Sequence, residues 1–236
     1  MQRTRGVVVI VFVAALAVVS GCTPGAPSGP IDPGPVSRKS VVVVGDSITW
    51  GASPQLTAAF NARNLVSSIN STPGTEVYQR RDEIRNVAAL RPNVVVMSMG
   101  SNDMGSVENP FRSPQDQLNW YNWSLANMRG ALDDLAAVPC VIWLTINDWT
   151  AFDVGNPVTG QYDLITWAPH YNNALRSEDA ARANLRVLDF NAAVRAQGLF
   201  WMADNMDNIV LHFDTPTGNQ WLANFIAANV SSICGV

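Results

Sequence analysis

The sequence contains few of the residues that bind metals and nucleic acids. Its 236 residues include only two histidines and three cysteines, and these form no cluster with the spacing of metal ligands. The net charge is −4 and no basic cluster occurs in the body of the chain, which argues against a nucleic-acid partner. Glycine-rich loops that hold dinucleotides or phosphates are also missing. We therefore predict no metal, no cofactor and no nucleic-acid partner.

The apolar run at the N-terminus is too short to cross a membrane comfortably. Val7–Val19 is an unbroken run of 13 apolar residues, whereas a spanning helix takes about 20. Arg3 and Arg5 precede the run and small residues follow it, as in a secretory signal. We predict a signal peptide over residues 1–21.

The sequence after this run resembles the lipobox of bacterial lipoproteins. The tetrapeptide is Val19-Ser20-Gly21-Cys22, and the resemblance implies that Cys22 is lipidated and becomes the mature N-terminus. Thr23–Ser37 is rich in proline, glycine and serine, which is typical of an extended linker. We predict that residues 22–37 tether an extracytoplasmic domain to the outer face of the bacterial cell membrane.

The other two cysteines, Cys140 and Cys234, allow two interpretations. Export to an oxidising compartment permits a disulfide between them. Alternatively, both are small buried apolar residues, since Cys140 opens an apolar run.

Residues 38–236 alternate between apolar runs and helical periods, which predicts one α/β domain. We expect a three-layer α/β/α sandwich around a mainly parallel sheet of about five strands. The strands are expected over Ser40–Val44, Leu65–Ile69, Asn93–Met99, Cys140–Ile146 and Leu185–Phe190.

Several helices between these runs have recognisable starts. The clearest is Pro114–Ala137, with apolar residues at steps of three and four and a Ser113-Pro114 start. Ser53-Pro54 and Thr215-Pro216 repeat this start signal before two other helices. The apolar positions of the first helix are Leu118, Tyr121, Leu125, Met128, Leu132 and Leu135, and those of the last are Leu222, Phe225, Ile226 and Val230.

Polar residues and glycines follow the first three predicted strands, where parallel sheets bind ligands. Asp46 and Ser47 come after the first strand and Gly74 lies in the turn after the second. Gly100-Ser101-Asn102-Asp103 follows the third strand, and Asn102 offers an amide donor. Each could be only a turn or a helix cap.

Two histidines are available to deprotonate a serine. His212 lies in the loop before the last helix, where a catalytic base is plausible. His170 falls within a predicted helix over Trp167–Asn184, where a surface or packing role fits better.

Together these segments resemble the SGNH hydrolase family, also called the GDSL esterases and lipases. The matching motifs are Gly-Asp-Ser-Ile-Thr at 45–49, Gly-Ser-Asn-Asp at 100–103, Gly74 and His212. The resemblance implies the flavodoxin-like fold of that family, Ser47 as nucleophile and His212 as base. It also implies an oxyanion hole made by the Ser47 N–H, the Gly74 N–H and the Asn102 side chain. Asp46, Gly100 and Asp103 are implied as supporting residues.

The sequence departs from the family pattern where the third catalytic residue is expected. The family has an aspartate three residues before its histidine, but this chain has Ile209 there. Asp207 is our candidate, while Asp204, Asp214 or a backbone carbonyl are alternatives.

The resemblance implies a secreted serine esterase that forms an acyl-enzyme on esters, including acetyl esters, of cell-envelope carbohydrate or lipid. An acyltransferase acting on envelope glycans and a non-catalytic binding lipoprotein are the alternatives. Asp148–Ile165 lacks a helical period and suggests a lid or binding loop. Its aromatic residues form an apolar or sugar-stacking wall, or are simply packed; they are Trp149, Phe152 and Tyr162.

Overall fold

The computed structural model describes residues 38–109, 111–148, 166–197, 212–213 and 216–236. The chain divides into two units, Met1–Val36 and Ser37–Val236, and every described helix and strand lies in the second. The predicted signal peptide, Cys22 and the linker lie outside the described residues, as do the 149–165 loop, Asp204, Asp207 and Asp214.

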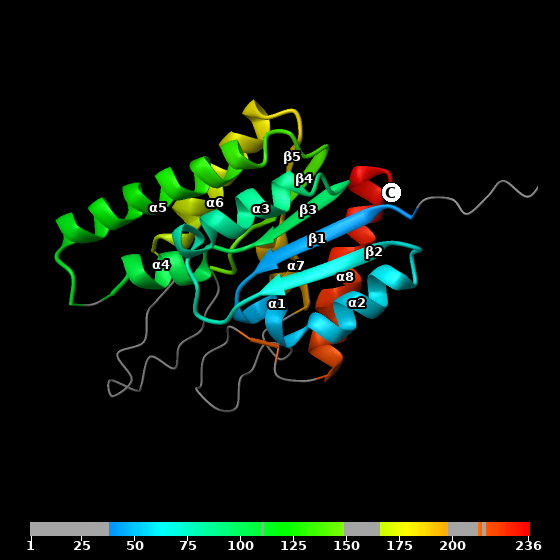
Figure 1. The fold of residues 1–236 in the computed structure, drawn as a ribbon. Coiled ribbons are helices and arrows are strands. Elements are labelled where there is room, and N and C mark those ends of the chain that lie inside the picture. The colour runs from blue at the N-terminus through cyan, green and yellow to red at the C-terminus, as the bar shows by residue number, and fades with distance from the viewer. Residues whose placement is uncertain (1–37, 110, 149–165, 198–211, 214–215) are drawn as a thin grey trace, which may run out of the picture. The chain divides into compact units, whose positions relative to one another are not determined.

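Five parallel strands form one sheet in the order β2-β1-β3-β4-β5 (Figure 1). This order is that of flavodoxin-like folds and confirms the predicted parallel sheet. Each strand lies within two residues of its predicted bounds: β2 ends two residues later than predicted, and β4 and β5 end two residues earlier. The strands are β1 (Ser40–Gly45), β2 (Val66–Ser71), β3 (Val94–Ser98), β4 (Cys140–Leu144) and β5 (Leu185–Leu188).

Helices cover both faces of this sheet, which confirms the three-layer α/β/α sandwich (Figure 1). One face packs against the 3-10 helix η1 (Val77–Arg80), α3 (Arg81–Ala89), α4 (Ser101–Val107), α5 (Pro114–Asp134) and α6 (Ala168–Ala181). The other packs against α1 (Ser47–Gly51), α2 (Ser53–Asn61), α7 (Phe190–Gln197) and α8 (Pro216–Cys234).

The central strands are buried on both faces because their side chains alternate between the two helical layers. Val42 and Val44 of β1 belong to the core on the α5 side, whereas Val41 and Val43 belong to the core on the α8 side. The edge strand β2 is half exposed, and its sequence is correspondingly polar.

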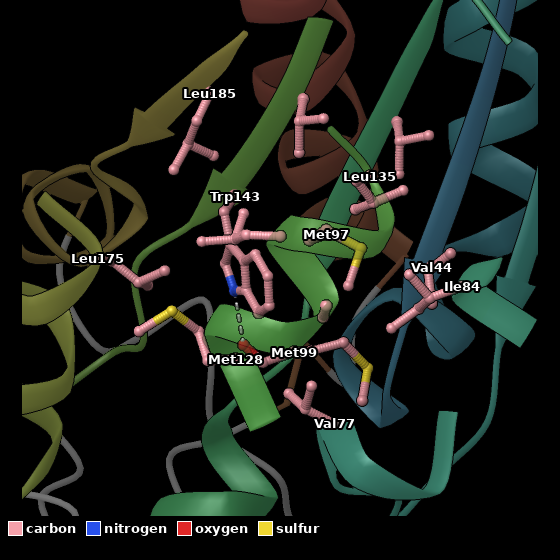
Figure 2. Close-up of a cluster of buried hydrophobic side chains, with 14 of the residues drawn as sticks. Val44, Val77, Ile84, Met97, Met99, Met128, Leu135, Trp143, Leu175 and Leu185 are labelled. Carbon is pink, nitrogen blue, oxygen red and sulfur yellow. Dashed lines mark hydrogen bonds between the residues drawn. The ribbon is translucent and has the colours of Figure 1, made fainter. Parts of the chain in front are cut away.

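Trp143 of β4 occupies the middle of the core on the α5 side (Figure 2). Its ring is fully buried, and its indole N–H donates a hydrogen bond of 3.1 Å to the carbonyl of Met99. This bond satisfies a buried donor and holds the chain where it leaves β3.

Of the three predicted helix starts, Ser113-Pro114 and Ser53-Pro54 are described in full, whereas Thr215 lies outside the described residues, and the two serines play different roles. Ser113 caps α5 as predicted, because its hydroxyl accepts the N–H of Asp116 at 3.2 Å. Ser53 was expected to cap a helix, but it is the first residue of α2 and its hydroxyl donates to the carbonyls of Thr49 and Trp50.

The apolar stripe of α5 is buried only along its second half. Leu125, Met128 and Leu132 are buried as expected, but Leu118 is 41% exposed. The prediction that Leu118 faces the core is therefore wrong.

A disulfide joins Cys140 at the start of β4 to Cys234 at the end of α8. This resolves the two interpretations of these cysteines in favour of the bridge. Among the described helices, none is both long and apolar enough to span a bilayer.

Candidate active site

The first candidate residues lie where the chain leaves β1 and β3 at the carboxyl edge of the sheet. In this strand order, β1 and β3 are neighbours whose connections run to opposite sides, which is where such folds bind ligands. Ser47 follows β1 and Asn102 follows β3.

Asp46 shapes the turn that presents Ser47. Its carboxylate accepts the N–H of Ile48 at 3.0 Å and so caps α1, and its own N–H donates to the Ser98 carbonyl at 3.2 Å. Gly45 is required for this turn, because a Cβ there would lie 1.8 Å from the Thr49 hydroxyl oxygen. Ser47 is therefore held at the first position of α1, beside the end of β3.

His212 lies directly against Ser47. Its Nε2 is 2.7 Å from the Ser47 Oγ, although the two residues are 165 positions apart in the chain. The neighbouring Phe213 is buried and packs against Phe190 and Trp221, which anchors the segment that carries the imidazole.

His170 lies elsewhere in the fold. It is exposed on α6, with its ring 5.9 Å from that of Trp167, as expected of a surface or packing residue. The structure thus brings Ser47 together with His212 and not with His170.

Asn102 lies beside the turn that carries Ser47. Its Nδ2 is 3.4 Å from an oxygen of Asp46, so one buried carboxyl contacts both turns. Gly100 caps α4 with a positive φ of 123°, and an added Cβ would lie 2.9 Å from the ring of Tyr171. Only glycine fits this tight exit from β3.

Asp103 connects α4 to η1, and η1 begins shortly after Gly74 in the chain. Its two carboxyl oxygens accept the Val77 N–H at 3.1 and 3.3 Å. Gly74 adopts a positive φ of 69° in the turn after β2. Asp103 therefore holds the segment that begins three residues beyond Gly74.

Burial dominates the electrostatics of these two acids. It raises the pKa of Asp46 to about 7, against the hydrogen bond from Ile48 and the positive charge of Arg80. It raises the pKa of Asp103 to about 8 despite the Val77 hydrogen bond, and the negative charges of Glu76 and Asp46 act in the same direction.

Arg80 is a site residue that sequence reasoning missed. It is buried, pairs with Glu83 at 2.5 Å, and donates to the carbonyls of Gly45 and Asn70 at the ends of β1 and β2. A single arginine in a charged segment resembles a solvated surface residue, so the sequence held no signal for it.

The predicted third catalytic residue, Asp207, lies outside the described residues together with Asp204 and Asp214. Its assignment stays a prediction. Within the described ranges, no group of three or more histidine, cysteine or acidic side chains is arranged to hold a metal ion.

The fold is a parallel α/β sandwich, and a serine contacts a histidine at its carboxyl edge. This arrangement is typical of a class of hydrolases. Residues 43–221 match the GDSL-like lipase/acylhydrolase family, and the chain belongs to that family. It is accordingly a serine hydrolase that acts on ester bonds. The comparison with curated proteins found no match.

Solved structures share the fold at low sequence identity. A GDSL-like lipase from Bacteroides thetaiotaomicron is 21% identical, with a TM-score of 0.55 over 83% of this chain and 89% of that chain. An acetylxylan esterase from Geobacillus stearothermophilus is 16% identical, with a TM-score of 0.55 over 81% and 94%. The catalytic domain of peptidoglycan O-acetyltransferase A from Streptococcus pneumoniae is 15% identical, with a TM-score of 0.55 over 83% and 94%.

Proposed function

We propose that Ser47 is the nucleophile and His212 the base of a serine esterase. The observation that carries this proposal is the 2.7 Å contact between Ser47 Oγ and His212 Nε2. A nucleophile and its base must lie within hydrogen-bond reach for proton transfer.

The reaction follows from this contact. With the imidazole proton on Nδ1, Nε2 accepts the Ser47 hydroxyl proton as the serine oxygen attacks the ester carbonyl carbon. The π electrons of the ester carbonyl move to the carbonyl oxygen, which becomes the oxyanion. When these electrons re-form the carbonyl, the bond between the acyl carbon and the alcohol oxygen breaks, and the alcohol oxygen takes the proton from Nε2. A water molecule repeats the sequence on the acyl-enzyme and releases the acid.

Three donors are proposed for the developing oxyanion: the N–H of Ser47, the N–H of Gly74 and the side chain of Asn102. The contact of Asn102 with Asp46 supports this role, because it restrains an amide beside the nucleophile turn. Donors fixed before the reaction stabilise the transition state without reorganisation. For the residue that orients His212, Asp207 remains our candidate.

The proposed substrates are acyl esters, including acetyl esters, of cell-envelope carbohydrate or lipid. The lipobox-like sequence ending at Cys22 supports export and lipid anchoring at the outer face of the cell membrane. Replacing Cys22 with serine is expected to abolish incorporation of labelled fatty acid and release the protein from membranes. Labelling that persists in this variant would contradict the anchor.

Acyl transfer to a glycan hydroxyl is the second candidate. Its support is the shared fold with a peptidoglycan O-acetyltransferase over most of both chains. The acyl-enzyme is the same in both reactions, and only the acceptor that attacks it differs.

A fluorophosphonate probe tests the proposed nucleophile, because it phosphonylates an activated serine. Mass spectrometry should find the adduct on the peptide containing Ser47, and Ser47→Ala and His212→Ala should both lose it. The His170→Ala variant serves as the matched control and should label like the parent. An adduct on another serine would contradict the assignment.

A further inference from the structure

The first half of α5 carries an exposed group of aromatic and carboxamide side chains. Trp123 is 38% exposed, and Tyr78 of η1 beside it is 41% exposed. Apart from Asp116 and the buried Ser124, the interspersed polar residues are carboxamides: Gln115, Gln117, Asn119 and Asn122.

Three of these residues line a hollow that we call the α5 groove: Asn119, Trp120 and Trp123. The groove is open and has a volume of about 380 Å³. Small-molecule sites fall between about 300 and 1,000 Å³, with aromatic walls and a few polar groups. The composition and size of the groove match such a site.

The rings of the groove are held in place by their neighbours. The centroids of Trp120 and Trp123 lie 5.1 Å apart with planes at 74°, and Tyr78 packs 4.6 Å from Trp123. On Trp120, the guanidinium of Arg112 lies 4.0 Å from the ring centroid and also donates to the Ser106 carbonyl at 2.8 Å. Because the rings are already ordered, a ligand loses little of its binding energy in fixing them.

The charges around the groove favour a neutral, hydroxyl-rich ligand. Helices that bind anionic membranes are rich in lysine and arginine. Between Pro114 and Met128, α5 has no basic residue and a single acid, Asp116. Arg112 does lie at the groove, but its guanidinium already contacts the Trp120 ring and the Ser106 carbonyl. Ring faces cover apolar C–H surfaces, whereas carboxamides both donate to and accept from hydroxyl groups. A sugar ring presents both kinds of surface.

The position of the groove connects it to the candidate active site. Tyr78 directly follows Val77, whose N–H is held by Asp103, the residue after Asn102. The η1 segment therefore links the aromatic wall to the proposed oxyanion donors.

We propose that the α5 groove binds a sugar ring of a carbohydrate chain that presents its acyl ester to Ser47. Presentation to Ser47 rests on the proposed function, whereas binding in the groove does not. The groove would then select carbohydrate esters over small alkyl esters.

The test uses calorimetric titration of the chain from Thr23 onward, which contains the whole unit Ser37–Val236. Ser47→Ala in this chain prevents turnover. Chitotetraose and xylotetraose are the probes, and at least one is expected to bind with a Kd of about 1 mM or tighter. Trp123→Ala and, as a milder second variant, Asn119→Ala should weaken binding about tenfold or more and about threefold, respectively.

Leu118→Ala is the matched control, because Leu118 is equally exposed on α5 but does not line the groove. It should bind like the parent. Absence of binding by both sugars, or binding unchanged in the Trp123 and Asn119 variants, would overturn the proposal. The proposal would also be overturned if neither sugar binds and Trp123 instead mediates binding to vesicles of phosphatidylglycerol and phosphatidylcholine, or to another protein.

The two proposals fail in different ways. If only the groove is wrongly assigned, hydrolysis of p-nitrophenyl acetate by the Ser47-containing chain persists and sugar binding is absent. If only the esterase is wrong, sugar binding persists without hydrolysis. Trp123→Ala should raise KM for acetylated xylo-oligosaccharides or chito-oligosaccharides, whereas Leu118→Ala should leave both this KM and p-nitrophenyl acetate hydrolysis unchanged.

Discussion

At the level of single residues, the contacts of Asp46 link the two turns of the candidate site. Its carboxyl group caps α1 below Ser47 and contacts the Asn102 amide. Asp103 adds a second link, from α4 to Val77. These contacts connect the turn that carries Ser47 to Asn102 and connect α4 to the segment after Gly74.

Asn102→Ala tests the proposed oxyanion donor. Loss of one such side chain is expected to lower kcat about 10²- to 10³-fold with little change in KM, because the donor acts mainly in the transition state. Steady-state kinetics on p-nitrophenyl acetate measures both constants. A variant with parental kcat would remove Asn102 from the site.

Asp103→Asn tests the raised pKa of a buried acid. Burial raises the pKa of Asp103 to about 8, so the folded protein keeps the proton up to about pH 8, whereas the unfolded chain loses it near the ordinary aspartate pKa of 3.8. The contribution of Asp103 to the free energy of unfolding is thus fully present below the unfolded pKa and falls as pH rises toward 8. The variant should show a flatter decline between pH 4 and pH 8 in urea titrations.

The exposed acid Asp82 provides the control for this pH series. Asp82→Asn should leave the pH dependence of the parent unchanged between pH 4 and pH 8. A parental slope in Asp103→Asn would mean that Asp103 is already ionised in the folded protein at low pH.

Some of these residues could be predicted from sequence and others could not. Ser47 and Asn102 stand in short motifs with characteristic neighbours, whereas His212 is singled out because it precedes the last helix and His170 falls within a predicted helix. The bond from Val77 to Asp103 and the burial of Arg80 depend on where η1 packs, which no local pattern encodes. The third catalytic residue remained open because the family position holds Ile209.

At the level of elements, the sheet was predictable because its strands are buried on both faces. Continuous valine-rich runs such as Val94–Ser98 are typical of parallel strands that are buried on both faces. The ends of elements were less predictable. Ser113 and Ser53 both precede proline, yet only Ser113 caps its helix, since the hydroxyl of Ser53 finds carbonyls at the end of α1 first.

Gly100→Ala tests how strictly α4 is positioned. The residue has a φ of 123°, and the new Cβ would meet Tyr171 at 2.9 Å and Ile146 at 3.0 Å. We expect a loss of about 2 kcal/mol or more in the free energy of unfolding, together with a reduced kcat as Asn102 shifts. Urea denaturation and ester hydrolysis measure the two effects.

Gly51→Ala is the corresponding control, because its nearest neighbour would be the Asn219 side chain at an ordinary 3.7 Å. Its stability should stay within about 0.5 kcal/mol of the parent. Equal stability of the Gly100 and Gly51 variants would show that the exit from β3 tolerates a side chain.

At the level of the whole molecule, the Cys140–Cys234 bridge ties the start of β4 to the end of the last helix. It closes a loop with a sequence separation of 94 residues, and long loops gain most from a cross-link in the chain-entropy account. The sequence left this bridge open because cysteine spacing alone does not reveal which side chains meet.

Removing the bridge should destabilise the whole fold. In the chain from Thr23 onward, Cys140→Ser with Cys234→Ser is expected to lower stability by about 2–4 kcal/mol, or roughly 4–16 °C in Tm. Circular dichroism on heating measures the change, and reductant should lower the parent Tm but not that of the variant. Free thiols in the unreduced, denatured parent would contradict the bridge.

The fold also explains why two distant residues could be paired in advance. A parallel sheet gathers the carboxyl ends of its strands at one edge, and His212 lies at that edge four residues before the last helix begins. Ser47 and His212 meet there at 2.7 Å. The catalytic use of that contact is the central claim.

Hydrolysis of p-nitrophenyl acetate by matched serine and histidine variants tests this claim most directly. Ser47→Ala and His212→Ala should each lower kcat at least about 10³-fold, whereas Ser53→Ala and His170→Ala should retain parental activity. Activity that survives Ser47→Ala or His212→Ala, or is lost equally in the two control variants, would contradict the assignment of the pair.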